Sequence, residues 1–148
     1  LLLKSMRQIV SAAEKLGVIV GIEAVHDHTL YCPEMMRRFL EDIDSPNVEA
    51  ILDPVNLISR ENHQNQDQVI EDAFKLYGDR ISVIHVKDFV MKDGEPEFAY
   101  VGTGLLRFET LMKKVKEQKP YIAMLLENSN PQRYHGDVEY LQGVYDRV

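Results

Sequence analysis

The chain alternates strictly between short apolar runs and longer amphipathic segments, and this alternation restricts its fold more than any other feature. Four runs have the length of strands and are rich in Val, Ile and Leu: 18–24, 48–53, 81–88 and 121–128. Apolar strands joined through helices pair in parallel, and the helices cover the sheet. We therefore predict an α/β fold with a parallel sheet, which is either half of a (β/α)8 barrel or an open doubly wound sheet.

The segments between these runs have the apolar spacing of helices. Predicted helices cover 2–16, 33–43, 67–78, 107–118 and 137–147. Gly17 is a natural stop for the first helix, and Pro33 suits the first turn of the second. Between the third strand and the fourth long helix we expect a long loop with a turn at "KDGEP". No linker or low-complexity tract interrupts the pattern, so we predict one unit over residues 1–148.

Each of the four predicted strands carries a side chain that can bind a metal at or near its carboxyl end. These residues are Glu23, Asp53, His85 and Glu127. They follow one another at intervals of about one strand and helix, so each belongs to a different strand. The carboxyl ends of parallel strands are the edge at which α/β folds build active sites. We therefore expect the four side chains to meet.

Three carboxylates that meet among apolar neighbours repel one another unless a cation lies between them. A site with three carboxylates and one imidazole suits a hard divalent ion, and we predict one Mn²⁺ or Mg²⁺, with Co²⁺ or Zn²⁺ as alternatives. Any one of these residues alone has an ordinary structural explanation, such as an exposed strand end. Four at matched positions favour a metal centre.

Composition narrows the class of partner. The formal net charge of −7 is unlike that of a dedicated nucleic-acid binder and favours a small-molecule partner. The longest apolar run, "GVIVGIEAV", is too short to span a bilayer and contains Glu23, so no membrane association is expected. Cys32 is the only cysteine, which excludes an intrachain disulfide and favours the cytoplasm.

Five motifs give the chain a family resemblance. In chain order they are "GIEAV", "ILDPVNL", "IHVKD", "VGTGLLRFETL" and "LLEN". Together they resemble the xylose isomerase-like TIM-barrel superfamily, and specifically its sugar phosphate isomerase/epimerase branch. They extend over nearly the whole chain and match the second half of such a barrel. The resemblance implies that residues 1–148 are the C-terminal half of a (β/α)8 TIM barrel.

The resemblance also implies roles for the four strand-end residues. In the family, the matching residues bind one divalent cation, and the two that match Glu23 and Glu127 also serve as acid and base groups. The implied reaction is isomerisation or epimerisation of a sugar or sugar phosphate through an enediolate. The substrate would be a small carbohydrate or polyol.

Three further residues are candidate substrate contacts. Lys87 shares a strand face with His85, so it either reaches a substrate oxygen or projects into solvent. Asn56 stands where many relatives have histidine, and its amide can bind a sugar hydroxyl but cannot replace imidazole as a base. His26 follows the first strand in a loop, where it contacts either substrate or solvent.

Alternatives to the isomerase prediction come from other branches and from the length of the chain. A dehydratase of inosose type uses a similar single-metal site, whereas the endonuclease branch needs further histidines that Asn56 and Tyr100 replace. A non-catalytic fragment or binding module is the other alternative. The first helical segment begins without a Met, as in a piece of a longer polypeptide. Half a barrel exposes two sheet edges and an apolar face, so we predict a homo-oligomer.

Overall fold

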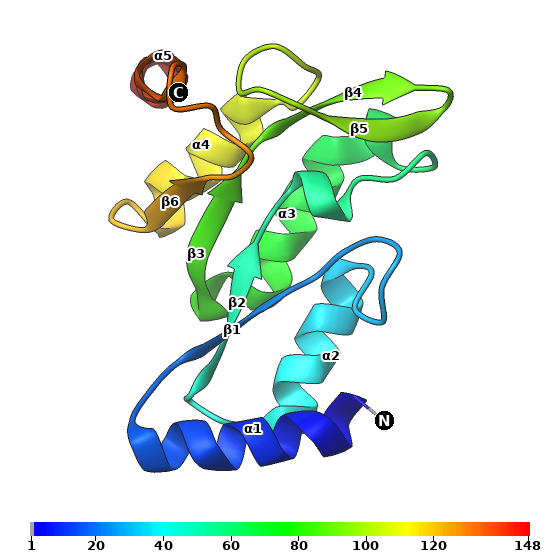
Figure 1. Ribbon diagram of the computed structural model, residues 1–148, viewed down its shortest axis with the longest axis vertical. Coiled ribbons are helices and arrows are strands. Elements are labelled where there is room, and N and C mark those ends of the chain that lie inside the picture. Colours follow the sequence, from blue (N-terminus) through cyan, green and yellow to red (C-terminus); the bar gives the residue numbers. More distant parts are fainter. Residues whose placement is uncertain (1) are drawn as a thin grey trace.

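Four parallel strands form the central sheet, and they lie side by side in the order in which they occur along the chain (Figure 1). The computed structural model describes residues 2–148. The strands are β1 (Val20–Glu23), β2 (Val48–Leu52), β3 (Ile81–Val86) and β6 (Ala123–Leu126). All three neighbouring pairs are parallel. The predicted parallel sheet is therefore confirmed, with each strand shorter than its apolar run.

Five helices accompany the sheet. They are α1 (Leu2–Leu16), α2 (Pro33–Ile43), α3 (Gln66–Tyr77), α4 (Phe108–Gln118) and α5 (Tyr134–Arg147). Single 3-10 turns lie at η1 (Val55–Leu57), η2 (His63–Asn65) and η3 (Gly78–Arg80). Gly17, with φ of 67°, ends α1, and Pro33 is in the first turn of α2, as predicted. None of the helices in residues 2–148 is long and apolar enough to cross a bilayer.

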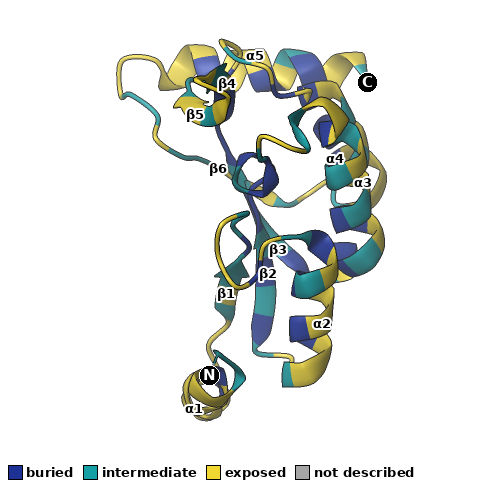
Figure 2. Cartoon of the chain, turned by 90° about the vertical axis from the view of Figure 1, so that its right-hand side faces the viewer, coloured by how far each residue is buried: buried dark blue, intermediate teal, exposed yellow. Residues whose placement is uncertain are grey.

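The arrangement of helices decides between the two predicted architectures. Helices α2, α3 and α4 all pack on the same side of the sheet, while α1 and α5 lie at its two ends (Figure 2). A doubly wound sheet has helices on both faces and reverses its strand order once. Here the order follows the sequence without reversal. The structure is thus a segment of a (β/α)8 barrel.

The hydrophobic core lies between the sheet and the helices. Alternate residues of β2, namely Val48, Ala50 and Leu52, are buried on the helical side. Ile84 and Val86 continue this layer on β3. Each large apolar side chain buried there stabilises the fold by about 1.5–3 kcal/mol. On the opposite side, which is the inner face of the barrel, Ile19 is 55% exposed and Leu125 is 51% exposed.

The segment after β3 differs from the prediction. Instead of a long loop it forms an antiparallel hairpin of β4 (Asp88–Lys92) and β5 (Glu95–Ala99). Asp93 and Gly94 form its two-residue turn with φ of 52° and 84°, as predicted for a turn at "KDGEP". Positive φ at both turn residues matches the right-handed twist of the flanking strands, which is why Asp-Gly closes a hairpin here.

Candidate metal centre

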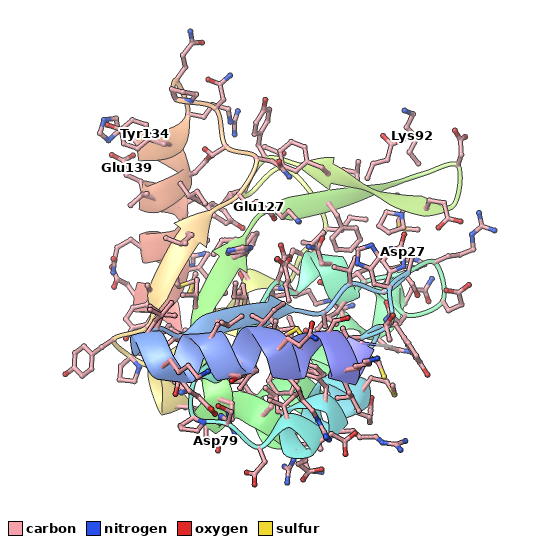
Figure 3. The ribbon with its side chains drawn as sticks, turned by 60° about the horizontal axis from the view of Figure 1, so that its bottom comes forward. Asp27, Asp79, Lys92, Glu127, Tyr134 and Glu139 are labelled. Atoms are coloured by element: carbon pink, nitrogen blue, oxygen red, sulfur yellow. The ribbon has the colours of Figure 1, made fainter. Side chains whose placement is uncertain are left out.

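The four strand-end residues converge at the carboxyl edge of the sheet. Each of them offers a ligand atom, and these atoms all lie within 4.8 Å of one another. We call Glu23, Asp53, His85 and Glu127 the strand-end cluster. In Figure 3 Glu127 lies near the middle of the molecule, and Asp79 lies at the bottom of the view. The predicted convergence is confirmed, because the ends of four neighbouring parallel strands necessarily reach the same edge.

Strand register brings each member into place. Glu23 is the last residue of β1 and pairs with Ile51, two residues before Asp53. His85 pairs with Leu125, two residues before Glu127. The backbone N–H of Glu127 donates to the carbonyl of Val86 at 2.9 Å, which extends the sheet by one residue.

Two atoms of the cluster are buried without a hydrogen-bond partner. They are Oδ2 of Asp53 and Nδ1 of His85. Nδ1 lies 3.4 Å from Oε2 of Glu23, and Oδ2 lies 2.8 Å from Nζ of Lys87 but outside hydrogen-bonding geometry. A buried polar atom without a partner is costly, and such atoms mark places where a ligand or ion completes the structure. Both are ligand types that divalent metals accept.

Lys87 inserts its ammonium group between two members of the cluster. It forms ion pairs with Asp53 and with Glu127, and only 7% of its side chain is exposed. The solvent-exposed alternative for Lys87 is therefore wrong. Burial lowers the pKa of Lys87, but the two carboxylates outweigh burial and raise that pKa above its ordinary value. The ammonium group is charged at neutral pH.

The two carboxylates beside Lys87 differ in their acidity. Burial, aided by a contact with Glu127, raises the pKa of Asp53 to about 7. Desolvation also raises the pKa of Glu127, but hydrogen bonding to Asp53 and Lys87 outweighs it and lowers the pKa below its ordinary value. Near neutral pH Asp53 is therefore partly protonated, whereas Glu127 is ionised.

Asn56 lies inside the centre rather than at its rim. Its side-chain amide donates to Oε1 of Glu23, and its backbone N–H donates to Oδ1 of Asp53 at 3.1 Å. Asn56 therefore holds one oxygen on each of two carboxylates. A contact with substrate stays a prediction for this residue.

His26 stays outside the strand-end cluster. It is half-buried in the loop after β1, and its backbone N–H donates to the carbonyl of Asn56 at 2.7 Å. The backbone of this loop is thereby tied to the centre, while a substrate contact of the imidazole remains a prediction.

Sequence reasoning missed the residue that orders the loop beside the centre. Asp88 is buried, and its carboxylate accepts N–H groups from Phe89, Gly104 and Leu106 at 2.8–2.9 Å. Gln66 is also buried and binds the same loop at Leu105 and Arg107. An aspartate at a strand end carries no signal for such contacts, because its partners come from another part of the chain.

The residues present fit a divalent cation. Three carboxylates and one ammonium group leave an excess of negative charge, and the donor set is rich in oxygen with a single imidazole. The two unpartnered buried atoms are ligand atoms of this set. A divalent cation would offset this negative charge and would bind both of these atoms.

Comparison with known proteins agrees with this architecture. A family model for the xylose isomerase-like TIM barrel matches residues 1–144. No curated protein sequence matches the chain. A xylose isomerase domain protein from Planctomyces limnophilus has a TM-score of 0.78 and 20% identity, over 99% of this chain and 52% of that one. A D-tagatose 3-epimerase-like protein has a TM-score of 0.76 and 24% identity, over 99% and 54%.

A third solved structure contains a metal. The IOLI protein with a bound zinc atom has a TM-score of 0.68 and 18% identity, over 98% of this chain and 52% of that one. At these identities the likeness concerns the fold alone. The chain spans about half the length of each of the three structures.

Proposed function

Because the chain belongs to the xylose isomerase-like TIM barrel family, we propose that it carries the metal-binding half of a sugar or sugar phosphate isomerase or epimerase. The observation that carries this proposal is the convergence of the strand-end cluster. The likeness to an epimerase-like protein and to a zinc-containing structure supports it.

The proposed site holds one divalent cation on the strand-end cluster. Oδ2 of Asp53 and Nδ1 of His85 are the ligand atoms best supported, since both are buried without a hydrogen-bond partner. The oxygen-rich set favours Mn²⁺ or Mg²⁺. Zn²⁺ stays among the ions to test because a similar fold holds it.

Glu23 and Glu127 are the proposed proton-transfer groups. They extend from β1 and β6, the two outer strands of the sheet, so a substrate bound over the centre lies between them. One carboxylate takes the proton from a carbon that bears a hydroxyl group, and an enediolate results. The other glutamate returns a proton. When bound, the metal supplies the positive charge that polarises the adjacent carbonyl.

Contacts within the chain distinguish the proposed roles of the two glutamates. Lys87 keeps Glu127 ionised, and an ionised carboxylate is the form that accepts a proton. Asn56 fixes the other glutamate through one oxygen and leaves its second oxygen facing His85. We propose that Glu127 is the base that removes the first proton. The proposed substrate is a small carbohydrate or polyol. The proposed setting is the cytoplasm, as predicted from the single cysteine.

Metal titration tests the site directly. Calorimetric titration with Mn²⁺, Mg²⁺, Co²⁺ and Zn²⁺, together with elemental analysis, should give close to one ion per chain. Glu127→Gln and His85→Ala should each lose most of this binding. His135→Ala is the matched control, since this imidazole is exposed and lies against Tyr134. Unchanged binding in both cluster variants would contradict the proposed centre.

The reaction class is tested by hydrogen exchange. The polypeptide that contains this chain should exchange the hydrogen beside the carbonyl of a ketose with solvent deuterium, and Glu127→Gln should abolish the exchange. Loss of water from an inosose without such isomerisation would favour the dehydratase alternative instead.

A further inference from the structure

Among the described residues, Lys87 is the only lysine or arginine that is buried. Its ammonium group lies 2.8 Å from Oδ2 of Asp53 and also contacts Oε2 of Glu127. Asp53 has a fully buried side chain, and Lys87 is nearly as buried. Most other ion pairs of residues 2–148 join largely exposed side chains, such as Lys92 with Glu97.

The charges of the strand-end cluster explain why the buried ammonium group of Lys87 is favourable there. Without a cation, the three carboxylates of the cluster would repel one another in a poorly solvated place. Among residues 2–148, Lys87 is the one lysine or arginine that forms an ion pair with any of them. The chain therefore supplies one positive charge of its own where the proposed metal would supply two.

The ammonium group and a metal ion compete for the same atoms. Oδ2 of Asp53 is buried and makes no hydrogen bond, so it is available as a metal ligand, yet it lies next to Nζ of Lys87. A divalent ion at the cluster and this ammonium group would lie within a few ångströms of each other and repel. The positive charge of Lys87 therefore opposes binding of the divalent ion.

We propose that Lys87 is an internal counter-cation, which keeps the ligands assembled in the metal-free chain and lowers their affinity for the divalent ion. This inference rests on the proposed function, because it takes the strand-end cluster as a metal site. It assigns Lys87 a positioning role in addition to any contact with substrate.

Lys87→Met removes the charge and keeps most of the side-chain length. Titrated with Mn²⁺ at about pH 8, this variant should bind about tenfold or more tightly than the wild-type chain, since one repulsive charge is gone. Stripped of metal with a chelator, it should melt roughly 10 °C lower, because the buried carboxylates lose their partner. Lys92→Met, which removes an exposed lysine of the β4–β5 hairpin, should change neither quantity (Figure 3).

The outcomes separate the two proposals. A wild-type chain that binds Mn²⁺ and a Lys87→Met variant with equal or weaker affinity would overturn the counter-cation and leave the metal site standing. A wild-type chain that binds none of the ions would overturn the metal site and the counter-cation together. If Lys87→Met does not fold, Lys87→Gln gives the same comparison, because glutamine is neutral and can still donate to Glu127.

Discussion

At the scale of single residues, Asn56 orients two carboxylates of the strand-end cluster. Its side chain binds Glu23 and its backbone binds Asp53, so it fixes two carboxylates from the short 3-10 turn η1. Residues that orient metal ligands in this way typically contribute tenfold to a hundredfold in metal affinity.

Replacing Asn56 by alanine should therefore weaken Mn²⁺ binding by about tenfold. The backbone bond to Asp53 survives this change, so the loss isolates the amide that holds Glu23. Calorimetry measures the effect, and Asn65→Ala serves as the control because Asn65 is exposed in the nearby turn η2. Equal Mn²⁺ affinity in both variants would show that the hydrogen bond from Asn56 to Glu23 does not contribute to metal binding.

The raised pKa of Asp53 predicts a pH dependence of metal binding. Below about pH 7 Asp53 holds a proton that the metal must displace, so affinity should rise with pH up to this value and level off above it. The slope below pH 7 should approach tenfold per pH unit for one proton. Titrations between about pH 5.5 and 8 measure it, and a flat profile would contradict the assignment.

The raised pKa of Asp53 has the opposite effect on the stability of the metal-free chain, which should fall as the pH rises. A carboxyl whose pKa is raised on folding keeps a proton that the unfolded chain releases. Its contribution to stability is therefore present below its ordinary pKa of 3.8 and is lost as the pH rises through about 7. Replacing Asp53 by asparagine should remove this part of the pH profile of unfolding.

The sequence predicted the four residues of the strand-end cluster but not their supporting contacts. Position at the end of an apolar strand, repeated four times, was enough to predict the cluster. Lys87 shares a face with His85, which alternation also predicts, yet its ion pairs with Asp53 and Glu127 depend on how three strands align. Alternation says on which side a residue lies and gives no distance to residues of other strands.

Periodicity predicted the helices and the sheet well at the scale of elements, and it failed at the hairpin. The run after β3 contains Asp93 and Gly94, and an Asp-Gly pair between two short strands is a hairpin signal. The hairpin was missed because only Lys87 separates β3 from β4, so the two strands look like one run in the sequence. The last helix also begins at Tyr134, three residues before its predicted start.

The loop beside the centre depends on Gly104 for its close approach to β4. A Cβ atom at this position would lie 2.2 Å from the carbonyl oxygen of Phe89 and 2.4 Å from Oδ1 of Asp88. Neither neighbour can move freely, since the first is backbone and the second accepts N–H groups from Phe89 and Leu106. Only glycine fits here without displacing the loop.

Gly104→Ala should therefore lower the free energy of unfolding by about 3 kcal/mol or more, through overpacking and broken bonds to Asp88. Gly136 is the matched control because a Cβ there meets no atom within 4 Å, and alanine in this helical position should be neutral or stabilise by up to about 1 kcal/mol. Urea unfolding compares the two. Equal stability of the variants would show that the loop adjusts without cost.

The inner face of the sheet determines the behaviour of the whole molecule. Figure 2 shows α2, α3 and α4 along one side of the strands, with α1 and α5 at the two ends of the sheet. Ile19 and Leu125 are about half exposed on the inner face, and Ile51 and Val83 lie between them on the middle strands. Exposed apolar faces of this kind usually mark interaction surfaces.

The chain as described should therefore associate through this face, and we expect sedimentation to show a homodimer or a larger assembly. Leu125→Glu places a charge on the face and should shift the equilibrium toward monomer, because a buried unpaired carboxylate is costly. Leu105→Glu is a matched control, since Leu105 is equally exposed at 51% but lies in the loop before α4. A monomeric wild-type chain, or equal association of both variants, would mean that the inner face does not drive assembly.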